Sequence, residues 1–172
     1  FCAWQWRLEH TDHNWNQAMT APVPAWDLYL AKLILAAGVS FLAQAAIGVL
    51  FVISGKLAGI DAPIPPELPG WLFFGGLGGA AVCALQLYLS LVIRAFAIPV
   101  TIALVGGIAG LMLTSQGLGY AFPYSLLCLG MRANNPTMVL DLGPFLLGCG
   151  VYILLFFALS VRHLTRRDVS AG

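Results

Sequence analysis

The sequence predicts an all-α fold, a polytopic transmembrane helical bundle, from its composition and from the length of its apolar runs. Of the 172 residues, 60% are hydrophobic and only 9% are charged, and the mean hydropathy is +0.88. Such a chain lies well outside the balance of a water-soluble globular domain. Four apolar runs are too uniform for a helix with one face in water, and each is long enough to cross a bilayer, which takes roughly 20 residues.

Residues 1–172 are predicted to form a single transmembrane domain that begins with the tail of an earlier span. Residues 1–6 are apolar and aromatic, and they show neither an initial methionine nor a signal-peptide pattern. We therefore expect a further N-terminal part before them. Residues 7–27 are more polar and are predicted to form a loop.

The four complete spans follow in order, with short connections between them. They are predicted over residues 28–53, 71–93, 96–114 and 139–161. The first span carries Lys32 near its start and no other charge. Four prolines in residues 61–70 cannot continue a helix and predict a short loop after it. The second span stops at Arg94, which leaves room only for a tight connection to the third.

Residues 115–136, between the third and fourth spans, contain an apolar patch that is too short to cross a membrane. This length favours a re-entrant or interfacial helix. Its aromatic residues suit the headgroup layer, and they are Tyr120, Phe122 and Tyr124. An ordinary external loop folded on the span ends is the alternative.

The basic residues favour one orientation, because cytoplasmic loops retain Lys and Arg. With the tail of residues 162–172 in the cytoplasm, six basic residues lie inside and two outside. The inside residues are Arg7, Lys32, Arg94, Arg162, Arg166 and Arg167, and the outside residues are Lys56 and Arg132. The loop of residues 7–27 is then cytoplasmic and the proline-rich loop external.

Several functional classes are excluded by what the sequence lacks. A net charge of +1 without a basic stripe argues against nucleic-acid binding. Cys2, Cys83, Cys128 and Cys149 form no close pair, so neither a zinc site nor a disulfide framework is expected. The chain has no phosphate-binding P-loop, no G-x-S-x-G and no H-E-x-x-H motif, so we predict no catalytic residues and no ATPase activity of its own.

Polar residues within the spans are few, and three of them are candidates for the translocation path. Gln44 and Gln86 are the better candidates, with hydrogen bonding between helices as their alternative role. Asp141 lies at the outer end of the last span, where we interpret it first as a helix N-terminal carboxylate and second as a substrate contact. The G-x-x-x-G pairs 75/79 and 106/110 predict close helix contacts, within the chain or across a dimer.

The loop of residues 7–27 has the pattern of a short amphipathic helix. Trp15 and Met19 stand at i, i+4 spacing and Pro22 ends the run. Such a helix could dock on lipid headgroups or on a cytoplasmic partner. His10 and His13 flank Asp12, but we expect this pair to be solvated and predict no metal site.

Three segments together carry the pattern of a transporter family. The first contains Glu9-His10, Asn14-Trp15, Thr20-Ala21-Pro22-Val23 and Tyr29-Leu30-Ala31-Lys32. The second is LQLYLSL at 85–91 followed by RAFA at 94–97, and the third is LGYAFPYS at 118–125. In order and spacing they resemble bacterial type-two ABC transporter permeases, in the branch of the lantibiotic-immunity and peptide-antibiotic-resistance permeases.

This resemblance implies six spans, so that residues 1–6 end the second and the four complete runs are spans three to six. It also implies that the loop carries the coupling helix that sits in a groove of the ATPase. The ATPase-facing residues would be Glu9, Asn14, Trp15 and Pro22, and Tyr29 and Lys32 would mark re-entry into the membrane. The chain departs from the family pattern at Asn16 and Asp27, where basic residues are expected. Alternatively, Trp15 anchors a surface helix and Lys32 snorkels to the headgroups.

The function implied by the resemblance is that of a permease subunit exporting an amphipathic substrate, such as a peptide antibiotic or lipid-like compound. The partners would be a separate ATP-binding cassette ATPase, a second permease copy or a related permease, and the lipid bilayer. No cofactor is expected, because the ATPase binds the ATP. The location would be the bacterial cytoplasmic membrane, with a cytoplasmic C-terminus. Two alternatives are an ATP-independent carrier or channel, which would need charges within the membrane, and a membrane scaffold.

Overall fold

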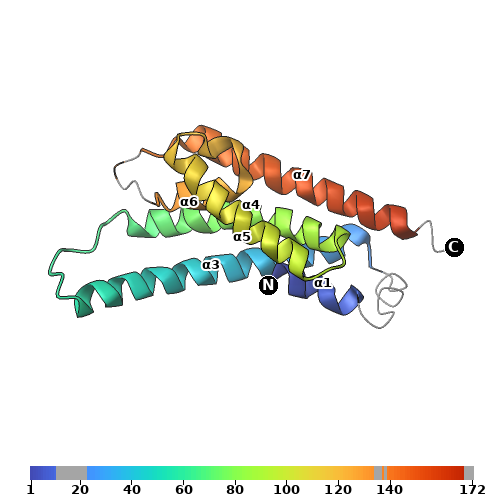
Figure 1. The fold of residues 1–172 in the computed structure, drawn as a ribbon, viewed down its shortest axis with the longest axis horizontal. Helices are drawn as coiled ribbons and strands as arrows, with labels where there is room; N and C mark the ends of the chain where they lie inside the picture. Colours follow the sequence, from blue (N-terminus) through green and yellow to red (C-terminus); the bar gives the residue numbers. More distant parts are fainter. Residues whose placement is uncertain (11–22, 134–136, 138, 169–172) are drawn as a thin grey trace.

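The computed structural model describes residues 1–10, 23–133, 137 and 139–168, and these residues form helices without any strand. The helices are α1 (Cys2–His10), α3 (Ala25–Leu57), α4 (Leu68–Val92), α5 (Ala97–Ser115), η1 (Gly119–Ala121), α6 (Pro123–Gly130) and α7 (Leu142–Asp168). Four of them, α3, α4, α5 and α7, are long and apolar enough to cross a membrane, and they run along one long axis (Figure 1). The predicted all-α bundle with four complete spans is confirmed.

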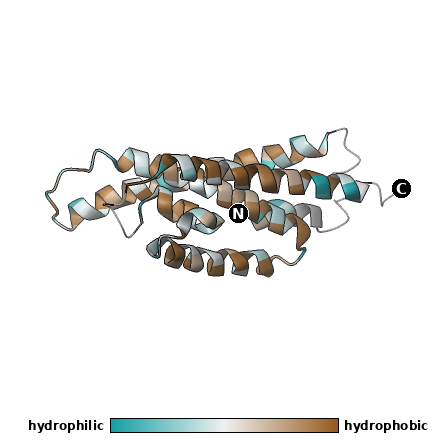
Figure 2. Ribbon diagram, turned by 90° about the horizontal axis from the view of Figure 1, so that it is seen from above, coloured by the Kyte–Doolittle hydropathy of each residue, from teal (hydrophilic) through white to brown (hydrophobic). Residues whose placement is uncertain are grey.

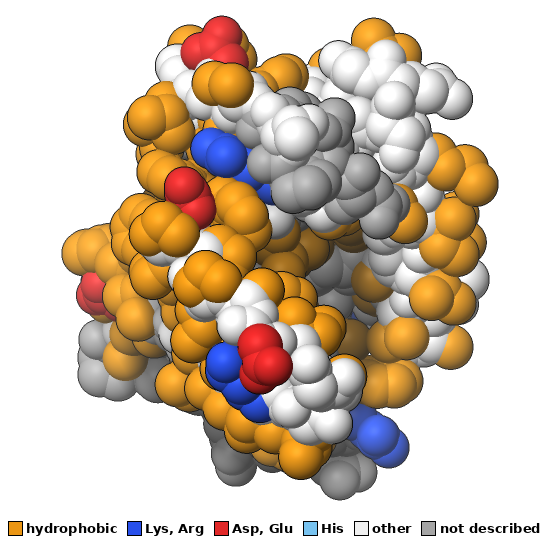
Figure 3. Space-filling model, turned by 90° about the vertical axis from the view of Figure 1, so that its left-hand side faces the viewer, with side chains coloured by type: hydrophobic (Ala, Val, Ile, Leu, Met, Phe, Trp, Pro, Cys, Tyr) orange, Lys and Arg blue, Asp and Glu red, His pale blue; other side chains and the backbone are white. Residues whose placement is uncertain are grey.

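Helix α4 is the centre of the bundle. It packs against α1, α3, α6 and α7, and 56% of its most apolar stretch is buried, against 17–22% for the other three long helices. The outward faces of those three helices carry leucine, isoleucine, valine and phenylalanine, as the hydrophobic colouring in Figure 2 and the surface in Figure 3 show. An apolar surface of this extent suits contact with lipid rather than water.

Helices α3 and α4 run antiparallel, so that the beginning of α3 lies beside the end of α4. The Tyr29 hydroxyl of α3 donates a hydrogen bond to the Ala84 carbonyl of α4 at 2.9 Å. Two turns further along α3, the Ala36 carbonyl accepts a contact from the Cys83 thiol at 3.6 Å. With both helices crossing the membrane, this antiparallel pairing places the start of α3 and the end of α4 on one side of it. The end of α3 and the start of α4 lie on the other side.

The helix ends differ by a few residues from the predicted spans, for physical reasons. Helix α3 extends the predicted 28–53 at both ends, with Asp27 in its first turn and Lys56 in its last, where each charge complements the helix dipole. Helix α4 begins at Leu68, inside the stretch we predicted to be a loop, because Pro69 lies in its first turn, where a helix needs no N–H donor. Helix α7 continues to Asp168, so most of the predicted basic tail is helical.

Two clusters of buried side chains form the interior. The α1-side core lies where α1, the start of α3 and the ends of α4 and α7 meet, and comprises Trp6, Tyr29, Leu33, Ala36, Ala84, Leu87, Leu91 and Leu164. The α6-side core lies between α4, α6 and α7 and comprises Ala81, Leu126, Leu129, Leu140, Phe145 and Cys149. The bundle is therefore held together at two separate levels along its axis.

Residues 115–133 fold back against the bundle instead of lying beyond its end. The Tyr124 ring, at the start of α6, packs on Gly106 of α5 and reaches the middle of α4, and the end of α6 at Gly130 lies against Phe74 near the start of α4. Helix α6 thus runs beside α4 between Phe74 and Gln86 (Figure 1). This packing favours the re-entrant helix over the loop folded on the span ends, although its depth in the membrane stays a prediction.

Candidate functional site

The predicted ATPase-facing residues fall largely outside the described part of the chain. Asn14, Trp15 and Pro22 are not among the described residues. Glu9 lies in helix α1, but only its backbone is described and its side chain is not. Their role in docking an ATPase therefore stays a prediction, and the structure bears on it only through the two helices, α1 and α3, between which the loop runs.

The predicted re-entry residues tie the start of α3 to its neighbours. Tyr29 is fully buried, donates its hydrogen bond to α4, and meets the Phe157 ring of α7 edge-on, with centroids 5.6 Å apart. The Lys32 ammonium donates a hydrogen bond to the Gln5 carbonyl of α1 at 2.7 Å and lies 4.6 Å from the centroid of the Trp6 ring. Lys32 is thus a specific contact between α3 and α1, in addition to any contact with headgroups.

Gln86 provides the polar link between α4 and α6. Its side chain is 8% exposed, and its Nε2 group donates a hydrogen bond to the Tyr124 hydroxyl at 2.5 Å. One turn later, the Ser90 hydroxyl donates to the Gln86 backbone carbonyl at 2.7 Å. Both partners of the side-chain bond are buried, so the role of interhelical hydrogen bonding is realised for Gln86.

Gln86 also lines a groove between α1, α3, α4, α5 and α6 with a volume of about 350 Å³. Ser40 is the other polar side chain of the wall apart from two thiols. The remaining wall is apolar and includes Val39, Ala43, Val82, Val100, Ala103 and Leu127. A groove of this lining suits an aliphatic or weakly polar guest and offers no charge to an ion.

The other two path candidates lie elsewhere. Gln44 is 4% exposed and packs against Gly75 of α4. Gly75 precedes Gln86 by eleven residues, which is about 16 Å along the helix axis. Its Oε1 atom is buried without a hydrogen-bond partner among the described residues. The structure therefore does not bring Gln44 and Gln86 together.

Asp141 immediately precedes the first residue of α7 and does not line the groove. It is exposed, and its carbonyl accepts the first hydrogen bond of the helix, from the Phe145 N–H at 3.2 Å. Its own N–H donates to the Tyr120 hydroxyl at 3.1 Å. This placement matches the first interpretation, a carboxylate at a helix N-terminus.

Both predicted G-x-x-x-G pairs serve contacts within the chain. On α4, a Cβ atom at Gly79 would collide with the Ser40 hydroxyl, and one at Gly75 would meet Met131 and the Gln44 amide. On α5, a Cβ atom at Gly106 would lie 2.6 Å from the Tyr124 ring, and one at Gly110 would lie 2.8 Å from the Tyr124 backbone. These glycines let α3, α5 and the α6 segment approach α4 and one another closely.

Sequence reasoning missed two residues that complete this region. Tyr124 was assigned to the headgroup layer, yet it is 7% exposed and faces the interior. Trp6 was taken only as the last residue of an earlier span, yet it is fully buried in the α1-side core. The clue to Tyr124 was available, because a glutamine within a span requires a polar partner on another helix.

The described part of the chain contains neither a metal-binding cluster nor a disulfide bond. No group of three His, Cys, Asp or Glu residues there could hold a metal ion. All four cysteines are free thiols.

The chain matches a known protein family over most of its length. Residues 1–110, well over half of the chain, match the family described as ABC-2 family transporter protein. No curated protein and no solved structure matches the chain.

Proposed function

The chain belongs to the ABC-2 family of transporter proteins, and on that premise we propose that it is a permease subunit that a separate ATP-binding subunit drives to export an amphipathic compound. The membership makes it a membrane component of an ABC transporter. The driving partner, the direction and the substrate are the proposed parts.

The observation that carries the proposal is the anchoring of both ends of the loop between α1 and α3. At one end, Trp6 of α1 is buried under Lys32. At the other end, Tyr29 of α3 is bonded to the centre of α4. A displacement of the loop by a partner protein is therefore passed to α4, the helix against which most of the bundle packs.

From α4 the displacement reaches the groove. Gln86 and Ser90 follow Ala84 on the same helix, and Gln86 bonds to Tyr124 of α6. ATP-driven movement at the loop would shift α1 and α3 against α4 and α6, which move as one unit, and so change the width of the groove, as alternating access requires.

The lining of the groove supports the substrate class. Its wall is apolar apart from Ser40, Gln86 and two thiols, which suits a lipid-like compound or the apolar face of a peptide. A peptide antibiotic is the narrower proposal, and it rests on the family resemblance alone. Two permease chains, identical or related, would complete the path.

The test is co-purification in mild detergent of the full-length protein with candidate ATP-binding subunits from the same source. Native protein should retain an ATPase, and Trp15→Ala and Glu9→Lys should release it. Matched controls are Trp4→Ala, an exposed tryptophan of α1, and Lys56→Glu, a charge reversal at the far end of α3, and both should retain it.

Equal retention by all variants would remove the loop from the interface. Failure of the native chain to retain any ATPase would contradict the proposed dependence on a separate ATPase. It would favour an ATP-independent carrier or a scaffold instead. If the native chain does retain an ATPase, stimulation of ATP hydrolysis by an amphipathic compound, measured on the purified complex, would identify the substrate class.

A further inference from the structure

Two of the four cysteines, which are far apart in the sequence, lie side by side in the fold. Cys2 is in the first turn of α1 and Cys83 is in the second half of α4. The Cys2 thiol donates a weak hydrogen bond to the Cys83 backbone carbonyl, with sulfur and oxygen 3.9 Å apart. The two thiol groups are also hydrogen-bond partners of each other. The spacing of 81 residues between the cysteines gives no indication of this proximity.

The pair lies at the junction of α1, α3 and α4. The Cys83 thiol donates to the Ala36 carbonyl of α3, and both cysteines pack against the α1-side core. The other two cysteines lie elsewhere, since Cys149 belongs to the α6-side core and Cys128 to helix α6. Cys2 and Cys83 are therefore the pair whose thiols the fold holds in contact.

A small uncharged molecule can reach both thiols. Each of the two cysteines is partly exposed, and both line the groove of about 350 Å³ between α1, α3, α4, α5 and α6. The side chains that form the wall of this groove carry no charge, so the groove favours an uncharged reagent over an ion. A hydroperoxide is a thiol oxidant that is both small and uncharged.

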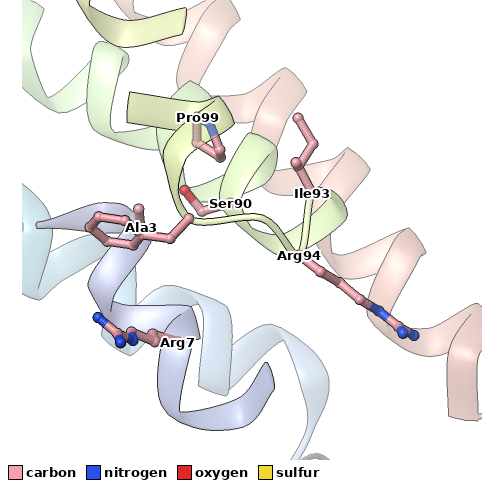
Figure 4. A pocket seen from close by; sticks show the side chains of 7 residues that line it. Ala3, Arg7, Ser90, Ile93, Arg94 and Pro99 are labelled. Atoms are coloured by element: carbon pink, nitrogen blue, oxygen red, sulfur yellow. The ribbon is translucent and has the colours of Figure 1, made fainter. Parts of the chain in front are cut away.

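Helix α1 is the element that a reaction at this pair would fix in place. It packs mainly against α4, and its first turn borders two open spaces. One is the groove, and the other is a cavity of about 280 Å³ beside the connection between α4 and α5 (Figure 4). Ala3, the residue after Cys2, lines both. The first turn of α1 therefore has room to move against α4 when no covalent bond joins the two helices.

We propose that Cys2 and Cys83 are a redox-active pair that a hydroperoxide oxidises to a disulfide between α1 and α4. One thiol attacks the hydroperoxide and the oxygen–oxygen bond breaks. The sulfur keeps a hydroxyl group as a sulfenic acid, and the departing oxygen takes up the thiol proton. The second thiol attacks this sulfur, the sulfur–sulfur bond forms, and the hydroxyl leaves as water with the second proton. The two thiols thus supply the two electrons that the hydroperoxide accepts, and a thiol reductant reverses the reaction.

The disulfide would hold α1 against α4. Its effect on transport rests on the proposed function, in which movement of α1 and α3 against α4 and α6 changes the width of the groove. With α1 fixed, movement at the loop would no longer reach the groove, although the ATPase would stay bound. Oxidation of the pair would therefore stop transport reversibly.

The first experiment detects the bond in the purified full-length protein in mild detergent. Hydrogen peroxide or cumene hydroperoxide is added, free thiols are blocked with iodoacetamide, and the peptides are identified by mass spectrometry with and without reduction. Native protein should form the disulfide between Cys2 and Cys83 at least about tenfold faster than any other pairing, because thiols held in contact react as if at a very high concentration.

Matched variants distinguish the pair from general thiol oxidation. Cys2→Ser and Cys83→Ser should each abolish the bond, whereas Cys128→Ser, at another partly exposed cysteine, should leave it unchanged. Phenylarsine oxide serves if a variant of the pair does not fold, because this reagent needs two neighbouring thiols. It should bind native protein and should no longer bind after oxidation.

Two results of this experiment would overturn the proposal. Equally fast oxidation of Cys128 would mean that exposure, and not proximity, decides which thiol reacts. Sulfenic acid at Cys2 or Cys83 without a bond between them would mean that the two sulfur atoms do not meet.

The second experiment measures ATP hydrolysis by the complex of the protein with its ATP-binding subunit. Hydroperoxide should remove most of the hydrolysis and dithiothreitol should restore it in native protein, and Cys83→Ser should be insensitive to both. Hydrolysis that is unchanged although the disulfide has formed would overturn the proposed stop of transport and the movement of α1 on which it depends. Failure of the native chain to bind any ATPase would overturn the proposed function, whereas the disulfide itself is judged by the first experiment alone.

Discussion

The two cores of the bundle are held together by different means. The α1-side core depends on large side chains, with Trp6 and Tyr29 fully buried and with hydrogen bonds from Tyr29 and Lys32 to backbone carbonyls. At the α6-side core, glycines bring helix backbones into contact: Gly78 of α4 lies against the Leu126 carbonyl, and Gly130 of α6 against the Phe74 carbonyl.

This difference has a mechanical meaning. Large side chains can change rotamer and still fill space, so a core made of them tolerates small shifts of one helix against another. Two backbones in contact have no such freedom. We therefore expect α4 and α6 to move together as a unit, and the adjustment between α1, α3 and α4 to take place at the α1-side core, next to the loop that is proposed to meet the ATPase.

The largest expected effect comes from the α1-side core. Trp6→Ala should lower the free energy of unfolding by about 3–5 kcal/mol, the usual cost of deleting a fully buried aromatic ring. Trp4→Ala is the control, because Trp4 lies on the same helix and is 55% exposed. Unfolding in detergent micelles, followed by circular dichroism, measures both. Equal losses would mean that Trp6 contributes no more to packing than an exposed residue does.

The next effect tests the backbone contact. Gly78→Ala places a Cβ atom against the Leu126 carbonyl, and since neither backbone can yield locally, we expect a loss of about 1–3 kcal/mol, as for overpacking. Gly107→Ala is the control on α5, with nothing within 4 Å of its Cβ position. It should be neutral or raise stability by up to about 1 kcal/mol, the helix propensity gain of alanine. A neutral Gly78→Ala would show that α6 is free to move away from α4.

The smallest effect concerns the polar link between α4 and α6. A double-mutant cycle of Gln86→Leu and Tyr124→Phe should give a coupling energy of about 0.6 kcal/mol, and not above about 1.7, the range for hydrogen bonds within membranes. The cycle of Gln86→Leu with Tyr152→Phe should be additive, because the Tyr152 hydroxyl donates to the Ala121 carbonyl instead. Additivity in both cycles would show that the bond between Gln86 and Tyr124 contributes nothing to stability.

The sequence was sufficient for the spans because lipid imposes a simple rule. A helix that crosses a bilayer must be apolar over a fixed length, and hydropathy alone located α3, α4, α5 and α7. Their ends were less predictable. Pro69 was taken as a residue that prevents a helix, although a proline in the first turn interrupts no hydrogen bond.

The candidate site was less predictable because it depends on which helix faces which. Gln44 and Gln86 were grouped as path residues since both are polar and lie within spans. The antiparallel register of α3 and α4 instead places Gln44 at Gly75, far along α4 from Gln86. Tyr124 could be placed only with the knowledge that α6 folds back on α4, a contact between segments 38 residues apart in sequence.

The unequal lengths of the spans make the bundle sensitive to the membrane around it. Helix α3 has 33 residues and α5 has 19, so they extend about 50 Å and about 29 Å, whereas the hydrocarbon layer is about 30 Å thick. Helix α5 fits that layer upright, and α3 must tilt or project beyond it. Because Tyr29, Lys32 and Gln44 hold α3 against α1 and α4, a change in bilayer thickness is taken up at the last turns of α3. The lipid composition of the membrane would then act on the packing of the bundle.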